Sequence, residues 1–170
     1  MIGFRCPSRT SSSCVISREE QGQLVFYALD PLQGQGKEII RTKLGQTNDM
    51  WWAISPDGSR IAIATWTQLR NNVRILDLRN GTERSLQLPQ NWAVEALCWA
   101  ADGDALFAYV YDSPSRNLMA CIDLGGKTHI LLNRNSSAPD PLALSPSPDG
   151  KYLAYFQGTI ESNVWLLENF

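Results

Sequence analysis

The sequence is poor in the residues that carry acid–base and metal chemistry. Its 170 residues include a single histidine, His129, and only four cysteines. No two cysteines form a C-x-x-C pair, so the ligand spacing typical of zinc sites is missing. His129 lies between Thr128 and Ile130 on an expected outer strand, which favours an ordinary exposed side chain over an imidazole base. The sequence therefore predicts no metal site and no cofactor.

The four cysteines leave two interpretations open. Cys6 and Cys14 can face each other across a hairpin and form a disulfide, while Cys98 and Cys121 have no such neighbour. Free cysteine is among the most frequently buried residue types. We therefore favour four buried thiols, and the redox compartment stays undecided.

Lysine is also scarce, and no long apolar run occurs. The formal net charge is −2, the arginines are scattered, and four lysines are present: Lys37, Lys43, Lys127 and Lys151. A basic nucleic-acid surface normally shows clustered cations, so we expect no nucleic acid to bind through this domain. No stretch reaches membrane-spanning length, and no apolar signal-peptide region follows residues 1–5. We expect a soluble chain without a membrane segment, either cytoplasmic or periplasmic depending on any sequence upstream.

Recognisable catalytic motifs are missing as well. The sequence contains no G-x-S-x-G nucleophile turn, no glycine-rich phosphate loop and no H-R-D or D-F-G segment. No loop offers the alternating oxygen ligands and closing glutamate of a calcium-binding EF-hand. The sequence therefore predicts that this chain is not itself an enzyme.

What the sequence does contain is a repeat of roughly 45 residues. Asp-Gly pairs precede hydrophobic runs at 57–58, 102–103 and 149–150. A second series of acidic residues follows those runs, at Asp30, Asp77, Asp123 and Glu168. A period of this size indicates one supersecondary unit used several times. We interpret the first series (Asp57, Gly58, Asp102, Gly103, Asp149 and Gly150) as structural turn residues, and the second as acceptors for turn amides.

The second unit shows the expected strands most clearly. They cover residues 51–54, 61–65, 73–78 and 83–88, with turns at Ser-Pro-Asp-Gly 55–58 and Asn-Gly 80–81. The third unit repeats this order at 97–100, 105–111, 118–124 and 128–132, and the fourth at 142–144, 152–156 and 163–168. The first unit is degenerate, with expected strands at 3–6, 14–17, 23–30 and 37–41.

Four antiparallel strands in each unit of this length predict an all-β β-propeller of about four blades. We place the blades at about 1–45, 46–90, 91–136 and 137–170, with the last blade incomplete. The chain is then a single propeller domain or the C-terminal part of one, and we favour the second. Residues 1–5 either begin the first blade or complete the last one. Open blade edges also predict self-association.

The Ser-Pro-Asp-Gly turns followed by aliphatic strands at 55–65 and 147–156 resemble the WD-repeat-like blades of TolB-type propellers. The Ala-Asp-Gly turn at 101–103 is a weaker copy. Segments 5–8, 26–31 and 163–170 also look like the C-terminal propellers of large bacterial signalling proteins, which follow a serine/threonine kinase or winged-helix domain. These resemblances imply a regulatory or sensory propeller. They do not imply a particular ligand.

Polar and aromatic residues in the inter-strand loops provide the candidate binding surface. Loops on a rigid scaffold are common binding sites, and an exposed tryptophan is a good interface anchor. If the loops share one rim, its members are Trp66, Trp92, Tyr111, Asp112, Arg116, Gln157 and Glu161. Packing against the next blade is an equal alternative for Trp66 and Trp92, while Trp52, Trp99 and Trp165 are expected to fill the core.

From these features we expect a non-enzymatic binding or scaffold module, either a protein-interaction or a sensory domain of a bacterial protein. Two alternatives remain. The chain is the C-terminal regulatory propeller of a kinase or winged-helix regulator, or it is the propeller part of a peptidase-type enzyme. The apolar inner strands at 51–54, 97–99 and 142–144 argue against the enzyme, because they offer no convergent acidic or imidazole groups.

Overall fold

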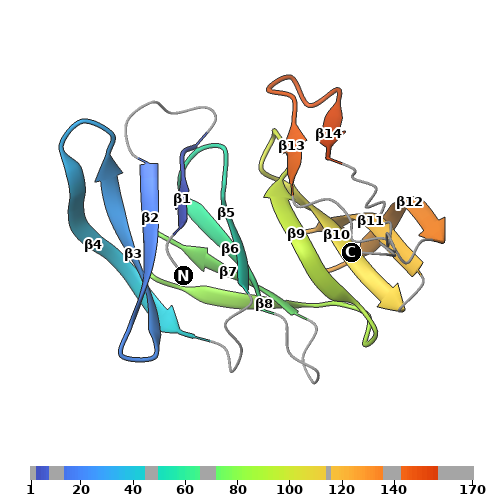
Figure 1. Cartoon of the computed structure of the whole chain (residues 1–170), viewed down its shortest axis with the longest axis horizontal. Helices are drawn as coiled ribbons and strands as arrows, with labels where there is room; N and C mark the ends of the chain where they lie inside the picture. Colours follow the sequence, from blue (N-terminus) through green and yellow to red (C-terminus); the bar gives the residue numbers. More distant parts are fainter. Residues whose placement is uncertain are drawn as a thin grey trace, which may run out of the picture.

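The computed structural model describes residues 3–7, 14–44, 50–65, 72–113, 116–135 and 143–156. All regular structure in these residues is antiparallel β-strand, arranged in three four-stranded sheets and one two-stranded sheet. Figure 1 shows the first sheet at one end, the second beside it, and the third and fourth together towards the other end. The prediction of an all-β fold built from repeated small sheets is confirmed.

Each sheet is a meander in which the strands pair in chain order. The first sheet contains β1 (Gly3–Arg5), β2 (Cys14–Glu20), β3 (Gln23–Asp30) and β4 (Gly34–Lys43). The second contains β5 (Met50–Ile54), β6 (Arg60–Thr65), β7 (Asn72–Asp77) and β8 (Glu83–Gln87). The third contains β9 (Ala93–Trp99), β10 (Ala105–Ser113), β11 (Arg116–Asp123) and β12 (Thr128–Asn135). The fourth contains β13 (Leu144–Pro146) and β14 (Leu153–Tyr155).

The pairing of β1 decides between the two roles considered for the N-terminal residues. Gly3 pairs with Ser17 and Arg5 with Val15, so β1 is the first strand of the first sheet. In the fourth sheet, β13 begins at Leu144, two residues later than the expected strand. The strand expected at residues 163–168, with Trp165, lies outside the described residues.

The Asp-Gly turns between the first two strands of a sheet are built by side-chain hydrogen bonds. The Asp57 carboxylate accepts hydrogen bonds from the Ser55 hydroxyl at 2.6 Å and from the Ser59 amide at 3.1 Å. Gly58 has a φ of 74°, a conformation that glycine adopts without steric cost. Asp149 repeats this arrangement with Ser147 and the Lys151 amide, and Asp102 accepts from the Asp104 amide. These aspartates have the geometry that a turn-forming role requires.

The second acidic series caps the turns between the third and fourth strands. The Asp30 carboxylate accepts from the Gln33 amide, Asp77 from the Arg79 amide and Asp123 from the Lys127 amide. The repeated spacing in the sequence therefore corresponds to a repeated hydrogen-bonding role.

The hydrogen bonds to Asp57 predict an acid-sensitive turn. Burial alone would raise the pKa of Asp57, but hydrogen bonds from Ser55 and Ser59 lower it to about 2, from an ordinary value of 3.8. A carboxyl with a depressed pKa in the folded state stabilises the protein above its unfolded pKa, and this contribution is lost as the pH falls through the folded value. The difference in unfolding free energy between the wild type and Asp57→Asn should therefore shrink between about pH 5 and about pH 2. Urea unfolding across this range measures it, and a difference that stays constant would contradict the prediction.

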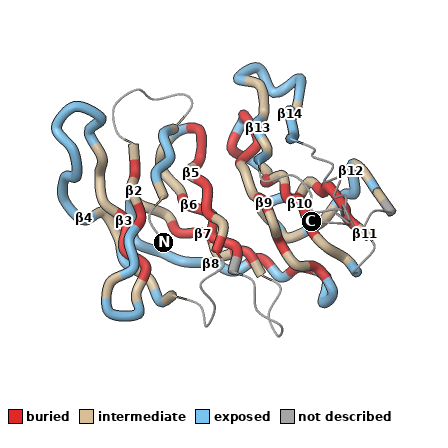
Figure 2. The backbone as a smooth tube through the Cα atoms, in the orientation of Figure 1, coloured by how far each residue is buried: buried red, intermediate tan, exposed pale blue. Residues whose placement is uncertain are grey.

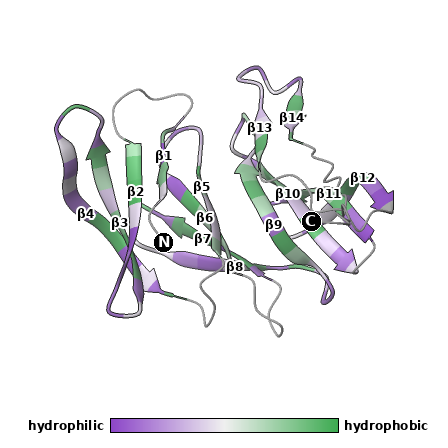
Figure 3. Cartoon of the chain, viewed as in Figure 1, coloured by the Kyte–Doolittle hydropathy of each residue, from purple (hydrophilic) through white to green (hydrophobic). Residues whose placement is uncertain are grey.

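The hydrophobic cores lie between consecutive sheets. Val15, Leu24 and Phe26 of the first sheet pack with Trp52, Ile61 and Ile63 of the second. The other face of the second sheet packs against the third, through buried residues such as Ala62, Val73, Leu106 and Ala120. Figure 2 shows buried positions along β5, β6 and β9, and Figure 3 shows mainly hydrophilic residues along β8 and hydrophobic ones along β9. Each sheet thus shields the apolar face of its neighbour, as blades of a repeat array do.

Polar contacts also join the second sheet to the third. The indole nitrogen of Trp99 donates a hydrogen bond to the Ala53 carbonyl at 3.0 Å, in a buried position. The guanidinium of Arg60 lies 4.7 Å from the centre of the Trp99 ring and donates to the Gly103 carbonyl at 2.8 Å. Trp99 is 3% exposed, as expected for a core residue. These contacts fix β5 and β9 beside each other.

The interpretation of all four cysteines as buried thiols is wrong. Cys6 and Cys14 form a disulfide, while Cys98 and Cys121 are free and partly buried. The physical reason is the register of the first two strands. Arg5 pairs with Val15. Cys6, which follows Arg5, therefore faces Cys14, which precedes Val15, and their Cα atoms are 4.1 Å apart.

Candidate binding groove

The innermost strands of the four sheets surround a cavity of about 490 Å³, which we call the inner groove. The residues that line it are Arg5 and Cys6, then Trp51, Ala53, Ile54 and Pro56, then Ala96, Leu97, Cys98, Trp99 and Ala101, and finally residues 143–148. A volume of this size is typical of binding pockets in proteins. The repeat is the cause of the groove, because each sheet presents its first strand to the same region.

The residues that line the inner groove are mostly apolar, while polar atoms form nearly half of its exposed surface. The large apolar residues of the lining include Trp51, Leu97, Trp99 and Leu144. Three prolines, Pro56, Pro146 and Pro148, also contribute. The prolines have a local cause, since two of them belong to the Ser-Pro-Asp-Gly turns that end β5 and follow β13. Such a lining favours an occupant that has both apolar side chains and polar groups.

Among the described strands, each innermost strand also has one edge without a partner strand. β5 pairs only with β6 and β9 only with β10 within their sheets, so the other edge of each faces away from its own sheet. Backbone amides and carbonyls on an open edge are able to pair with an extended chain. The inner groove therefore combines apolar walls with backbone hydrogen-bonding groups.

Cys98 is the free thiol in the groove lining. Burial raises the pKa of Cys98 to about 12, against a smaller lowering effect of a backbone hydrogen bond at Phe107. The thiol is protonated at neutral pH, whereas the nucleophilic form of cysteine is the thiolate. Cys98 is therefore a packing group in this structure.

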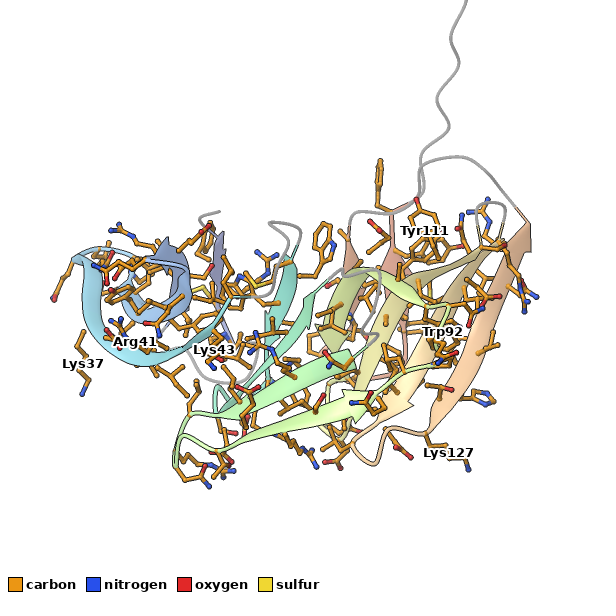
Figure 4. All side chains as sticks on the ribbon, turned by 90° about the horizontal axis from the view of Figure 1, so that it is seen from below. Lys37, Arg41, Lys43, Trp92, Tyr111 and Lys127 are labelled. Atoms are coloured by element: carbon orange, nitrogen blue, oxygen red, sulfur yellow. A yellow bond between two sulfur atoms is a disulfide. The ribbon has the colours of Figure 1, made fainter. Side chains whose placement is uncertain are left out.

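Three residues of the predicted rim lie together at the end of β10 and the start of β11. Arg116 forms an ion pair with Asp112 at 2.9 Å, and the Asn91 amide donates hydrogen bonds to the backbone carbonyl and the carboxylate of Asp112. The Tyr111 ring contacts the Tyr109 ring edge to face, with centroids 6.3 Å apart. Figure 4 shows Tyr111 at one edge of the third sheet. That this cluster binds a partner stays a prediction.

Trp92 does not lie on an exposed rim. Its side chain is 5% exposed and belongs to the core between the second and third sheets, with Leu86 and Leu88. The expected inner strand began at residue 97, but β9 begins at Ala93, so Trp92 directly precedes a strand. Figure 4 shows it among the strands. Of the two roles considered for Trp92, the structure supports packing, while Trp66, Gln157 and Glu161 lie outside the described residues.

Four of the cations lie on segments that do not line the groove. Figure 4 shows Lys37, Arg41 and Lys43 along β4 and Lys127 at the far end of the molecule, in the turn before β12. Arg41 also forms an ion pair with Glu38. That no nucleic acid binds through this domain stays a prediction. The described residues contain no long apolar helix of the kind that crosses a membrane.

The inner groove was missed at the level of the sequence, where the apolar inner strands served only as an argument against catalysis. The same strands, with a proline in the turn after β5 and after β13, recur at the repeat spacing. Residues that recur at the same place in each blade lie around one axis, so their apolar character also indicated a common apolar groove.

Comparison with known proteins identifies the architecture. No family model matches the sequence, and no curated protein matches it. Among solved structures, TolB from Acinetobacter baumannii superposes with a TM-score of 0.65 at 17% identity, over 95% of this chain and 39% of TolB. Hydrazine synthase from Kuenenia stuttgartiensis superposes with a TM-score of 0.57 at 20% identity, over 92% of this chain and 42% of the synthase chain. The chain spans about two fifths of the length of each, and its fold is that of a TolB-like β-propeller in partial form.

Proposed function

We propose that this chain is a non-enzymatic interaction module that holds an extended, largely apolar segment of a partner protein in the inner groove. The observation that carries the proposal is the groove itself, which has about 490 Å³ of space and is lined by residues from all four sheets, most of them apolar. Open edges of the innermost strands offer backbone pairing to such a segment, which is a common mode of peptide recognition.

The chemistry of the lining supports binding rather than catalysis. Its residues include two serines, two cysteines and one arginine, and neither a histidine nor a carboxylate among those that the structure describes. Cys6 is bound in a disulfide, and the Cys98 thiol is protonated at neutral pH. The TolB-like fold is compatible with this role, although fold alone does not determine function.

A selection from a random peptide library tests the proposal. We expect peptides with apolar residues to be enriched on the wild-type chain and to bind Ser145→Trp at least about tenfold more weakly. Ser145 lines the groove in β13 and is exposed, so a tryptophan there fills space without disturbing the core. Ser85→Trp, on the outer strand β8, is the matched control and should bind as the wild type does. Failure to enrich any peptide, or equal binding to Ser145→Trp, would overturn the proposal.

A further inference from the structure

Arg5 is the one charged residue among the described residues that line the inner groove. It is the last residue of β1, where the first sheet meets the groove. This inference rests on the proposed function, because it concerns which segment the groove accepts. An arginine among apolar walls offers a planar set of donors that matches a carboxylate.

The structure holds Arg5 in place from three sides. The backbone of Arg5 pairs with Val15 on β2, and the next residue, Cys6, is tied to Cys14 by the disulfide. The guanidinium lies 5.6 Å from the centre of the Trp52 ring, and its Nη1 donates to the Phe4 carbonyl at 2.8 Å. Trp52 is itself 6% exposed and packs edge to face on Phe26. Arg5 thus lines the groove as an exposed residue whose guanidinium is supported by the Trp52 ring.

Among the described residues, no neighbour neutralises the charge of Arg5. No described carboxylate forms an ion pair with it. Asp57 and Asp149, which follow groove prolines in the sequence, direct their carboxylates into their own turns through Ser55, Ser59 and Ser147. Arg60, the other arginine beside a groove residue, is held on the Trp99 ring and the Gly103 carbonyl. Apart from the bond to Phe4, the described residues leave the donors of the Arg5 guanidinium to an occupant.

We infer that Arg5 selects an occupant carrying a carboxylate, so that the partner segment of the inner groove is apolar with an acidic side chain at the Arg5 end. Apolar walls bind apolar segments without regard to charge, whereas a fixed guanidinium discriminates between charged and neutral ones. The disulfide contributes by keeping Arg5 at the groove. Arg5 is therefore a specificity-determining residue of the site.

Two dyes with the same aromatic skeleton test the inference without a known partner. The probes are 1-anilinonaphthalene-8-sulfonate, which is an anion, and N-phenyl-1-naphthylamine, which is neutral. Fluorescence titration of Arg5→Gln should show about tenfold weaker binding of the anion and unchanged binding of the neutral dye. Arg5→Lys should retain most of the anion affinity, and Arg84→Gln, an exposed arginine on β8, should leave both affinities unchanged.

Ser145→Trp separates the two possible failures. If it weakens both dyes but Arg5→Gln weakens neither, the dyes occupy the groove and the inference about Arg5 is wrong, while the proposed function stands. If Ser145→Trp weakens neither dye, both the groove as a binding site and the role of Arg5 are rejected. If Arg5→Gln weakens both dyes equally, Arg5 supports β1 and does not select charge, which also overturns the inference.

Repeating the peptide selection on Arg5→Gln should remove an enrichment of Asp and Glu that the wild type shows.

Discussion

Replacement of Trp99 by alanine is expected to lower the free energy of unfolding by about 3–5 kcal/mol. The side chain is 3% exposed, packs in the core between the second and third sheets, and supports the Arg60 guanidinium. Its removal leaves a cavity and also leaves the Ala53 carbonyl without its buried donor. Urea unfolding followed by circular dichroism measures the change.

Trp99→Phe tests the contribution of the hydrogen bond to stability separately from that of the packed ring. Phenylalanine keeps most of the packing but cannot donate to the Ala53 carbonyl, so this variant should lose about 1–3 kcal/mol. Trp51→Phe is a control, because Trp51 is only half-buried on the neighbouring inner strand. A Trp99→Ala variant as stable as the wild type would contradict the packing of the second sheet on the third.

Removal of the Cys6–Cys14 disulfide is the second large expected effect. The two cysteines are eight residues apart, and the chain-entropy relation for a loop of this length gives about 2.5 kcal/mol. Cys6→Ser with Cys14→Ser should lose roughly this amount of stability, and reduction of the wild type by a dithiol should have the same effect. Chemical unfolding under oxidising and reducing conditions measures both.

The control for the disulfide is Cys121→Ser, which changes a free thiol on β11. The dithiol should lower the stability of Cys121→Ser by the same amount as it lowers the stability of the wild type. Because β1 pairs only with β2, the loss should be concentrated in the first sheet, and amide hydrogen exchange should increase most at residues 3–5 and 15–17. Equal stability of the oxidised and reduced wild type would contradict the prediction. Persistence of the disulfide in the cell would favour an oxidising compartment.

The sequence predicted the architecture because the repeat appears at several levels at once. Asp57 and Asp149 form nearly the same hydrogen bonds in their turns, so identical local chemistry marked equivalent positions. The apolar character of β6 on both faces, with Ile61 to Ala64 all buried, indicated a strand between two layers. Local chemistry and the period agreed, and this agreement is what made the fold predictable.

The errors concern features that depend on register or on exact strand ends. Whether Cys6 and Cys14 meet depends on which residues of β1 and β2 are paired, and composition does not contain this information. Trp92 lies between strands as expected, and the choice between packing and binding stayed open because it depends on β9 starting at Ala93, four residues before the expected strand. Arg5 was not singled out, because its role depends on the convergence of four strands from different parts of the chain.

Solution NMR of the Trp99 indole tests most directly whether the sheets pack radially with their first strands side by side. We predict that the indole proton of Trp99 exchanges slowly with water and shows nuclear Overhauser contacts to Ala53 on β5, since the two are joined by a hydrogen bond of 3.0 Å between different sheets. Rapid exchange of this proton, together with contacts confined to the third sheet, would contradict radial packing.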